Sequence, residues 1–474
     1  MFSLPDAAKA IGAKLVFADS ETRASGASID TRSLKPGDCF FALPGTQTDG
    51  HAFLPEAFRL GASSAVVSST FYEEEIQNRP APEGFKNLLV VENPEIALAE
   101  IAAWRRSQCS IPFIGITGSV GKTSTKEFLQ YLLQAFAGEG SVLATRGNLN
   151  NHLGLPLTLL NLTKEHRFCV AEIGANARGD IAFLCKILKP TAGILTCVAP
   201  VHLKGFGSLE TIYQTKTDLL RALPSQAPAV ISSGDSHLDA LVDALDLSIR
   251  RAGSPGSLNG KISAVRIDDG WVSFCFRDQF QFAFPGLASF LVLNAAMALL
   301  MAEALGVDLA KLPERWEGFC LPEGRFSVKN LGGGVRVIFD GYNSSPKACE
   351  KALETFASLP LEGRRIAVVS DMLELGEESE AFHRQIGEMA AERELDAIFA
   401  YGPESRAVIQ GFKEKAVRGE SGHFESSDSL ARHLAVFLKP GDMVLMKASR
   451  GMKIERVLQS LEADSRFART VLRI

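Results

Sequence analysis

The chain has 474 residues, of which 46% are hydrophobic and 22% are charged. This composition is typical of folded globular proteins and excludes a disordered or collagen-like chain. Its 50 basic and 55 acidic side chains give a formal net charge of −5, so no basic excess indicates nucleic acid or an anionic membrane surface as a partner. None of the eight cysteines lies in a C-x-x-C pair. We therefore expect buried free thiols in the reducing cytoplasm, with neither a disulfide framework nor a zinc site.

The length predicts about three domains, and the first spans about residues 1–110. Its start has an early proline and aspartate and no continuous apolar run, so we expect no signal peptide. Short strand-like segments at 28–45 and 61–69 are separated by Pro and Gly turns. A linker is expected at 104–112. These features predict a small N-terminal α/β domain.

The second block, about residues 111–322, alternates strands with helices. Apolar strands are expected at 113–117, 168–175, 192–200 and 227–234, with helical patterns between them. That order predicts a doubly wound parallel sheet. The apolar run 286–302 is marginal for spanning a bilayer and is interrupted by Asn294, so we expect a buried helix and no membrane insertion.

The third block, about residues 323–474, repeats this pattern on a smaller scale. Strands are expected at 336–343, 365–372, 396–402 and 442–449. The fold class is therefore α/β with three domains: a central P-loop sheet, the small N-terminal domain and a Rossmann-like C-terminal domain. Ligands in such sheets bind at the carboxyl ends of the strands, so residues at those ends are the first candidates for a site.

The segment TGSVGKTS (117–124) follows a strand and opens a helix, which is the context of a phosphate-binding loop. Backbone N–H groups and the helix N-terminus converge there on phosphate oxygens, a lysine adds charge, and a hydroxyl can ligate Mg²⁺. The expected nucleotide contacts are Gly118, Ser119, Val120, Gly121, Lys122, Thr123 and Ser124. No N-K-x-D guanine motif and no protein-kinase signature is present. The loop alone leaves kinase, ATPase and ligase open.

Polar residues at neighbouring strand ends extend the candidate site. Glu172 ends the strand at 168–175, where a carboxylate is a suitable Mg²⁺ ligand. His202 follows the next strand, but a lone histidine is as often structural, and Lys216 on its own indicates a solvated helix lysine. The amide-rich segment 146–154 carries donors and acceptors suited to sugar or peptide groups, or is a plain polar loop.

These residues resemble a known family, the Mur ligases, which make the cytoplasmic precursor of bacterial peptidoglycan for the cell wall. TGSVGKTS, AEIGAN and HLKGFGSLE…QTK (202–216) are similar to the family's T-G-x-x-G-K-T, E-x-G-A and H-L-x-x-F-G-S…K segments. Segments 30–53, 148–156, 339–346 and 371–376 narrow the likeness to members that add D-alanyl-D-alanine to UDP-N-acetylmuramoyl-tripeptide. The resemblance covers nearly the whole chain.

The resemblance implies an ATP-dependent amide ligase that works through an acyl phosphate and releases ADP and phosphate, as a monomer. Lys122, His202 and Lys216 would be catalytic, and Lys216 matches a lysine that relatives carbamylate. Two magnesium ions would be held with help from Thr123, Glu172, His202 and Lys216. ATP would also contact Asn294, Arg325 and Asp340. Substrate contacts would be Thr31, Arg32, Asp49, Gly50 and His51 for the UDP moiety, the amides Asn148, Asn150 and Asn151, and Asn343, Ser344, Ser449 and Arg450 for the dipeptide.

Three departures from the family pattern stand out. The usual His-Asn pair before the adenine helix is Phe290-Leu291, the expected K-G-S-R is KASR (447–450), and Ser370 replaces a usual Gly. The first leaves open a catalytically inactive binding protein. A sibling ligase that adds a single amino acid, a folate polyglutamylating ligase and a non-ligase ATPase are further alternatives. The ligase reading also predicts a closing swing of the third domain near 321–325.

Overall fold

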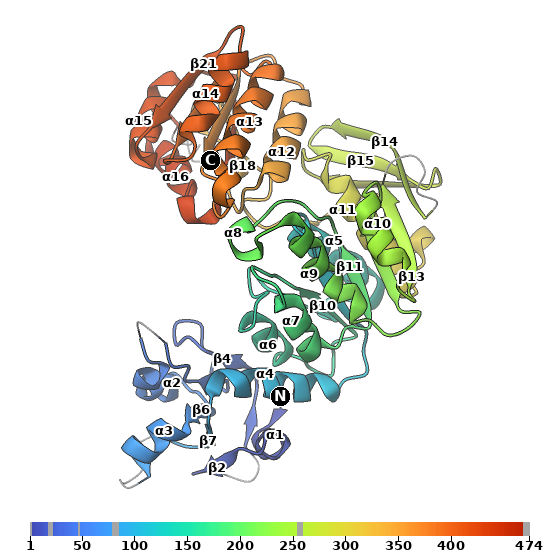
Figure 1. The fold of residues 1–474 in the computed structure, drawn as a ribbon, viewed down its shortest axis with the longest axis vertical. Coiled ribbons are helices and arrows are strands. Elements are labelled where there is room, and N and C mark those ends of the chain that lie inside the picture. Colours follow the sequence, from blue (N-terminus) through green and yellow to red (C-terminus); the bar gives the residue numbers. More distant parts are fainter. Residues whose placement is uncertain (1, 18–21, 46–47, 78–84, 254–258, 468–474) are drawn as a thin grey trace, which may run out of the picture.

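The computed structural model describes residues 2–17, 22–45, 48–77, 85–253 and 259–467. Figure 1 shows three bodies along the long axis, with the N-terminal one at one end, the C-terminal one at the other and the central one between them. Each is built on its own main sheet, so the predicted three-domain α/β class is confirmed. Within the described ranges, none of the helices has the length and apolar character needed to cross a membrane. The domain boundaries near residues 110 and 322 stay predictions.

The first domain carries a sheet in the order β2-β7-β6-β5-β4, parallel except for β2. The strands expected within 28–45 and 61–69 are present as β5 and β6; residues 46–47 of the segment 30–53 lie outside the described residues. Its elements are β1 (Phe2–Ser3), α1 (Leu4–Ile11), β2 (Lys14–Val16), β3 (Arg23–Ala24), β4 (Ala27–Ser28), β5 (Cys39–Phe41), η1 (Gly50–Phe53), α2 (Leu54–Arg59), β6 (Ser64–Ser68), α3 (Ser69–Phe71), η2 (Tyr72–Ile76), β7 (Leu88–Val91) and α4 (Pro94–Ser107).

Helix α4 joins the first domain to the central one. The prediction of a linker at 104–112 is wrong for its first four residues, because α4 continues to Ser107. The guanidinium of Arg106 donates from Nε to the carbonyl of Leu188 at 2.7 Å, and Leu98 is buried in one hydrophobic cluster with Leu155 of the central domain. The first two domains therefore share a core across this helix.

The central sheet runs in the order β16-β15-β14-β13-β12-β11-β8-β10-β9. The four predicted strands are confirmed as β8, β10, β11 and β12, all parallel. Because β8 lies between β10 and β11, the loops that follow these three strands meet at one edge of the sheet. The elements are β8 (Phe113–Thr117), α5 (Lys122–Ala137), β9 (Val142–Ala144), α6 (Gly154–Leu159), β10 (Phe168–Glu172), α7 (Asp180–Leu188), β11 (Ala192–Leu195), α8 (Leu203–Phe206), α9 (Leu209–Arg221), β12 (Pro228–Ser232), α10 (Ser236–Asp243), β13 (Ser248–Gly253), β14 (Gly260–Asp268), β15 (Trp271–Phe276), β16 (Phe280–Pro285), α11 (Leu291–Ala304) and η3 (Leu309–Lys311).

Two features of the central domain bear on the sequence analysis. The apolar run 286–302 lies largely in α11, which packs against α5 and is buried on most of its surface, so the expected buried helix is confirmed. The sheet also extends beyond the predicted parallel part through the antiparallel strands β14, β15 and β16. Figure 1 shows β14 and β15 next to the third domain.

The third domain is the predicted Rossmann-like unit. Its sheet runs β17-β18-β22-β19-β20-β21, parallel except for β17. The four predicted strands are β18, β19, β20 and β22. The elements are β17 (Ser327–Asn330), η4 (Gly332–Gly334), β18 (Arg336–Asp340), α12 (Pro346–Ser358), β19 (Arg365–Ser370), η5 (Gly376–Glu378), α13 (Ser379–Glu392), β20 (Ala397–Tyr401), α14 (Arg406–Lys415), β21 (Glu420–Phe424), α15 (Ser427–Phe437), β22 (Met443–Lys447), η6 (Arg450–Met452) and α16 (Glu455–Ala463).

Candidate active site

The phosphate loop connects β8 to α5, and residues that follow β11 hold its conformation. Gly118 and Gly121 have φ values of 143° and 91°, a region that favours glycine. A Cβ on Gly118 would lie 2.0 Å from the hydroxyl oxygen of Thr196. That hydroxyl donates to the carbonyl of Val120 at 2.6 Å, and the Ser119 hydroxyl donates to the carbonyl of Ala199 at 2.8 Å. The loop is thus held open at the N-terminus of α5, where its N–H groups can meet an anion.

Lys122 is the cation of this loop. Its Nζ donates to the carbonyl of Gly118 at 2.8 Å, and burial lowers the pKa of its ammonium, with the carboxylate of Glu172 acting in the opposite direction. The amide of Asn294, on α11, donates to the carbonyl of Gly121 at 3.2 Å and to Thr125 Oγ1 at 2.9 Å. Asn294, which was expected to contact adenine, therefore braces the loop against α11.

Glu172 ends β10 and is 3% exposed. Its Oε2 accepts a hydrogen bond from Thr123 Oγ1 at 2.9 Å, and its Oε1 accepts one from Asn150 Nδ2 at 2.8 Å. The backbone N–H of Glu172 donates to Thr145 Oγ1. Three of the expected site residues, Glu172, Thr123 and Asn150, thus lie together, with Glu172 in contact with the other two. Asn151 instead accepts from the N–H of Gly154 at the start of α6.

Lys216 lies on α9 and is 1% exposed, so the sequence-based picture of a solvated helix lysine is wrong. Burial, with the nearby charge of Lys122 as a second cause, lowers the pKa of its amine to about 7. Its Nζ lies 5.5 Å from the ring centre of Phe206 and makes no hydrogen bond within the described part of the chain. A large share of this amine is therefore neutral at neutral pH.

The third domain reaches the loop through Arg325. Its Nη2 donates to Thr123 Oγ1 at 2.9 Å, and its guanidinium stacks over the ring of Tyr342 at 4.1 Å. Asp340 is buried at the end of β18, where its Oδ2 accepts from Lys447 Nζ at 2.6 Å. Of these two expected ATP contacts, Arg325 therefore touches the loop, whereas Asp340 is held in an ion pair inside its own domain.

The other expected residues of the third domain lie at the same interface. Asn343 and Arg450 line a cavity next to the loop. The hydroxyl of Ser344 is buried against the thiol of Cys349 at 3.1 Å, and that of Ser449 accepts from a backbone N–H at 3.0 Å. Asn343 and Arg450 are thus the members of this group that reach the first cavity defined below.

Two cavities meet at the loop, and Ser119, Lys122, Arg325 and Asn343 line both. The first cavity has a volume of about 610 Å³; the second has a volume of about 860 Å³. The first cavity is lined by Asn148, Asn150, Asn151, Glu172, Asp180, His202, Lys216 and Arg450 among others. The second is lined by the rest of the loop, Phe290, Leu291, Asn294, Asp340, Ser344 and Lys447 among others. An extended ligand can therefore lie across the loop with its anionic part at Lys122.

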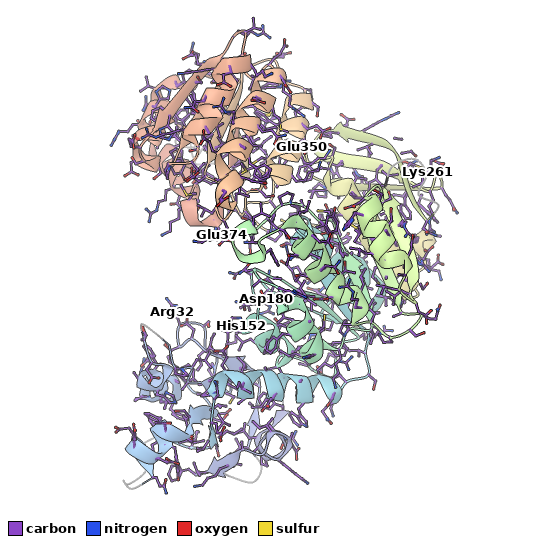
Figure 2. The ribbon with its side chains drawn as sticks, in the orientation of Figure 1. Arg32, His152, Asp180, Lys261, Glu350 and Glu374 are labelled. Atoms are coloured by element: carbon purple, nitrogen blue, oxygen red, sulfur yellow. The ribbon has the colours of Figure 1, made fainter. Side chains whose placement is uncertain are left out.

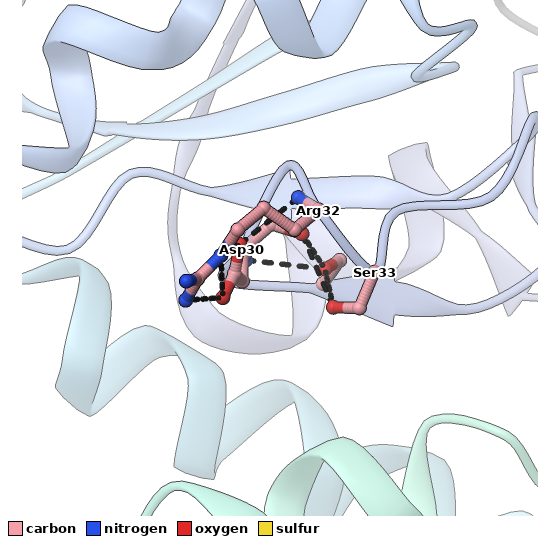
Figure 3. Close-up of polar contacts among 4 residues, drawn as sticks. Asp30, Arg32 and Ser33 are labelled. Atoms are coloured by element: carbon pink, nitrogen blue, oxygen red, sulfur yellow. Dashed lines mark hydrogen bonds and ion pairs between the residues drawn. The ribbon is translucent and has the colours of Figure 1, made fainter. Parts of the chain in front are cut away.

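The first-domain candidates do not line either cavity. Arg32 is 87% exposed and pairs with Asp30, whose carboxylate also accepts the Arg32 backbone N–H at 2.9 Å (Figure 3). Figure 2 shows Arg32 on the side of the first domain turned toward His152 and Asp180. Thr31 adjoins it in the same turn.

His51 and Asp49 have internal roles. The Nδ1 of His51 contacts Asp49 Oδ1 at 2.6 Å, its Nε2 accepts the N–H of Ser68 at 3.0 Å, and its ring stacks on Phe71 at 4.4 Å. With both nitrogens used and 5% exposure, His51 fixes the turn at Gly50. Its ring has no nitrogen left for a ligand.

Sequence reasoning missed several residues of this site. Thr196 supports the loop, Tyr342 stacks on Arg325, and Glu374 contacts His202 through Nδ1. Thr196 follows directly on β11, so its place at a strand end was an available signal. Tyr342 is placed by a contact within the third domain and Glu374 by a contact between domains, and one sequence carries no local signal for either contact.

The oxygen donors fit a hard divalent cation. The Glu172 carboxylate and the Thr123 hydroxyl are adjacent and face the loop, and such oxygens suit Mg²⁺. In the parts of the chain that the structure describes, no three His, Cys, Asp or Glu side chains are grouped closely enough to hold a metal ion. A magnesium ion here would therefore complete its shell with water and phosphate oxygens, which is common for this ion.

Comparisons with known proteins cover all three domains. The Mur ligase middle domain matches residues 116–302, the "Mur ligase, glutamate ligase domain" matches 324–450, and the "Mur ligase family, catalytic domain" matches 23–106. The UDP-N-acetylmuramoyl-tripeptide--D-alanyl-D-alanine ligase of Haemophilus influenzae is 32% identical over 96% of this chain and 97% of its own length. The Escherichia coli ligase of the same name is 30% identical over 92% and 93%.

Solved structures agree with these matches. MurF from Acinetobacter baumannii superposes with a TM-score of 0.83 at 26% identity, covering 98% of this chain and 99% of that one. MurF ligase from Thermotoga maritima in complex with ADP has a TM-score of 0.76 at 32% identity, covering 93% and 97%.

Proposed function

This chain belongs to the Mur ligase family, and on that basis we propose that it joins D-alanyl-D-alanine to UDP-N-acetylmuramoyl-tripeptide with ATP. Relatives that carry the name of this ligase align with it over nearly their whole length. The observation that carries the proposal is the bond from Arg325 to Thr123. It brings the third domain onto the phosphate loop, beside a cavity that also holds Glu172 and Lys216. A ligase needs this meeting of nucleotide and amine-binding domains.

The reaction has two steps. The tripeptide carboxylate attacks the γ-phosphoryl group of ATP, which gives an acyl phosphate and ADP. The free amine of the dipeptide then attacks that carbonyl, and phosphate leaves. Two anions must first come together, and the ammonium of Lys122, the N–H groups of the loop and the guanidinium of Arg325 would neutralise their charge.

Magnesium would be held by Glu172 and Thr123, with His202 at the edge of the same cavity. When bound, it would offset phosphate charge and align the two reacting oxygens. The lowered pKa of Lys216 supports carbamylation, because a neutral amine is the form that reacts with CO₂. The carbamate would place an anion in a wall of the first cavity, where the amine has no hydrogen-bond partner among the residues that the structure describes.

We assign one task to each domain. Residues 1–110 would hold the UDP-sugar, through the exposed turn of Thr31 and Arg32. Residues 111–322 would hold ATP, and residues 323–474 would close on it and bind the dipeptide near Asn343 and Arg450. A cytoplasmic monomer fits the eight free thiols, most of them buried, and the location of the nucleotide substrates.

The test is phosphate release with Mg-ATP, UDP-N-acetylmuramoyl-tripeptide and D-alanyl-D-alanine, with each substrate omitted in turn. We expect release only with both substrates present, and a product heavier than the tripeptide by the dipeptide. Release without the dipeptide would instead indicate a bare ATPase or a ligase with another amine. Absence of release in the complete mixture would contradict the proposal and point to the altered Phe290-Leu291 segment.

A further inference from the structure

One contact between the central and third domains is not used by the mechanism above. The carboxylate of Glu374, in the loop after β19, contacts Nδ1 of His202, the residue that precedes α8. The backbone adds a second link, from the N–H of Lys204 to the carbonyl of Glu374 at 3.4 Å. Figure 2 shows Glu374 at the edge of the third domain that faces α8.

Both residues have unusual backbones. His202 has φ 49° and Glu374 has φ 66°, a left-handed conformation that residues other than glycine rarely adopt. Such conformations persist where surrounding contacts enforce them, and they cluster at functional sites. The backbone conformation of each residue therefore directs its side chain across the boundary between the central and third domains, toward the other side chain.

The loop that carries Glu374 is held by its own domain. The N–H of Met372 donates to Nε2 of the fully buried His383 at 2.9 Å, and the N–H of Leu373 donates to Ser449 Oγ at 3.0 Å. Because the loop is anchored in the third domain, Glu374 reaches His202 only when that domain lies against α8. The contact thus depends on the position of the domain.

The contact is too exposed to matter much for stability. The His202 side chain is 33% exposed and that of Glu374 is 55% exposed, and ion pairs this open to water add little to folding. What the Glu374 carboxylate can do chemically is orient the imidazole ring of His202. A carboxylate that accepts from Nδ1–H leaves the Nε2 lone pair available and fixes the ring plane. His202 lines the first cavity together with Lys122 and Glu172.

We propose that Glu374 is a positioning residue: on closure of the third domain it fixes the ring and tautomer of His202, so that Nε2 becomes a competent metal ligand. The inference rests on the proposed function, since it concerns the same site. It gives the segment 371–376 a task that the ligase chemistry left unassigned. It also links metal binding to domain closure, so that ATP is activated only when the amine-binding domain is in place.

The first test needs no metal and no turnover, and the third domain is closed with a non-hydrolysable ATP analogue and UDP-N-acetylmuramoyl-tripeptide. In protein labelled with ¹⁵N-histidine, His202 is assigned among the eight histidines by the signals lost in His202→Asn. We expect a protonated Nδ1 and a bare Nε2 in the wild type and in Glu374→Gln, whose amide oxygen can accept the same bond. Glu374→Ala should give a mixture of tautomers. Glu377→Ala, which removes an exposed carboxylate directly after the segment 371–376, is the matched control and should match the wild type.

The second test measures Mn²⁺ affinity by electron paramagnetic resonance with a non-hydrolysable ATP analogue. Loss of an orienting partner of a metal-bound histidine typically weakens binding about 10- to 100-fold, which is the loss expected for Glu374→Ala. An unchanged His202 tautomer in Glu374→Ala, or Mn²⁺ affinity within about twofold of wild type, would overturn the proposal. Because the tautomer is read without turnover, a failed ligation assay would not mimic either result.

Discussion

Replacement of Lys216 tests the chemistry of the buried amine. Its pKa of about 7 makes about half of the amine neutral at pH 7, against on the order of one part in 3,000 for an ordinary lysine near 10.5. The reactive form is thus enriched roughly a thousandfold. Above pH 7 the neutral amine persists, and below pH 7 it is lost to protonation, so carbamylation should fall as the pH drops through 7. We expect Lys216→Ala to lower kcat about 10- to 100-fold, as loss of a metal-supporting group does.

The assay has two parts. Wild-type protein in ¹³C-bicarbonate should show a carbamate carbon signal that is absent in Lys216→Ala and weakens below pH 7. Formate or acetate should then restore part of the activity of Lys216→Ala, because a small acid can fill the vacated space and supply the anion. Lys204→Ala, an exposed lysine of α8, is the control and should keep both signal and activity. Absence of a carbamate signal together with absence of rescue would refute the reasoning.

Further predictions concern the loop and the interface. Lys122→Ala should lower kcat about 100- to 1,000-fold while the melting curve stays unchanged, because the removed ammonium is itself desolvated; near-normal turnover would refute the phosphate site. Gly121→Ala puts a Cβ 2.4 Å from the amide of Asn294 and should weaken binding of a fluorescent ADP analogue. Gly138→Ala, with φ 98°, ψ 155° and open space at the far end of α5, should lower stability only, by about 1–3 kcal/mol. In small-angle scattering, ATP with substrate should shrink the wild type but not Arg325→Ala; equal radii would argue against closure through Arg325.

The parallel strands and the phosphate loop could be predicted because their signals are local. A short apolar run such as 113–117, followed by Gly118 and Lys122, predicts a strand and a phosphate-binding loop without any information from the rest of the chain. The antiparallel strands β14–β16 were missed although a local signal was present. Asp269 and Gly270 form the two-residue turn between β14 and β15, with φ values of 45° and 75°, and Asp-Gly is a strong hairpin signal. Most residues of β14 are only partly buried or exposed, so this strand has no apolar run to mark it.

Side-chain roles that depend on distant partners could not be predicted. His51 was expected to bind substrate, yet Ser68 and Asp49 use both its ring nitrogens. Glu374 lies 172 positions from His202 in the chain, so nothing around either residue indicates their contact. Burial of Lys216 likewise depends on how α9 packs on the sheet.

The shared core across α4 has a consequence for substrate choice. Because this helix ties the first domain to the central sheet, the exposed turn at Arg32 and the phosphate loop are held at a set spacing. If the domains divide the tasks as proposed, that spacing sets the length of UDP-sugar peptide that can reach from the turn at Arg32 to the phosphate loop. A precursor shorter by one residue would bring its carboxylate up to roughly 3.3–3.6 Å short of the γ-phosphate, and so would be rejected by length without any contact to the missing residue.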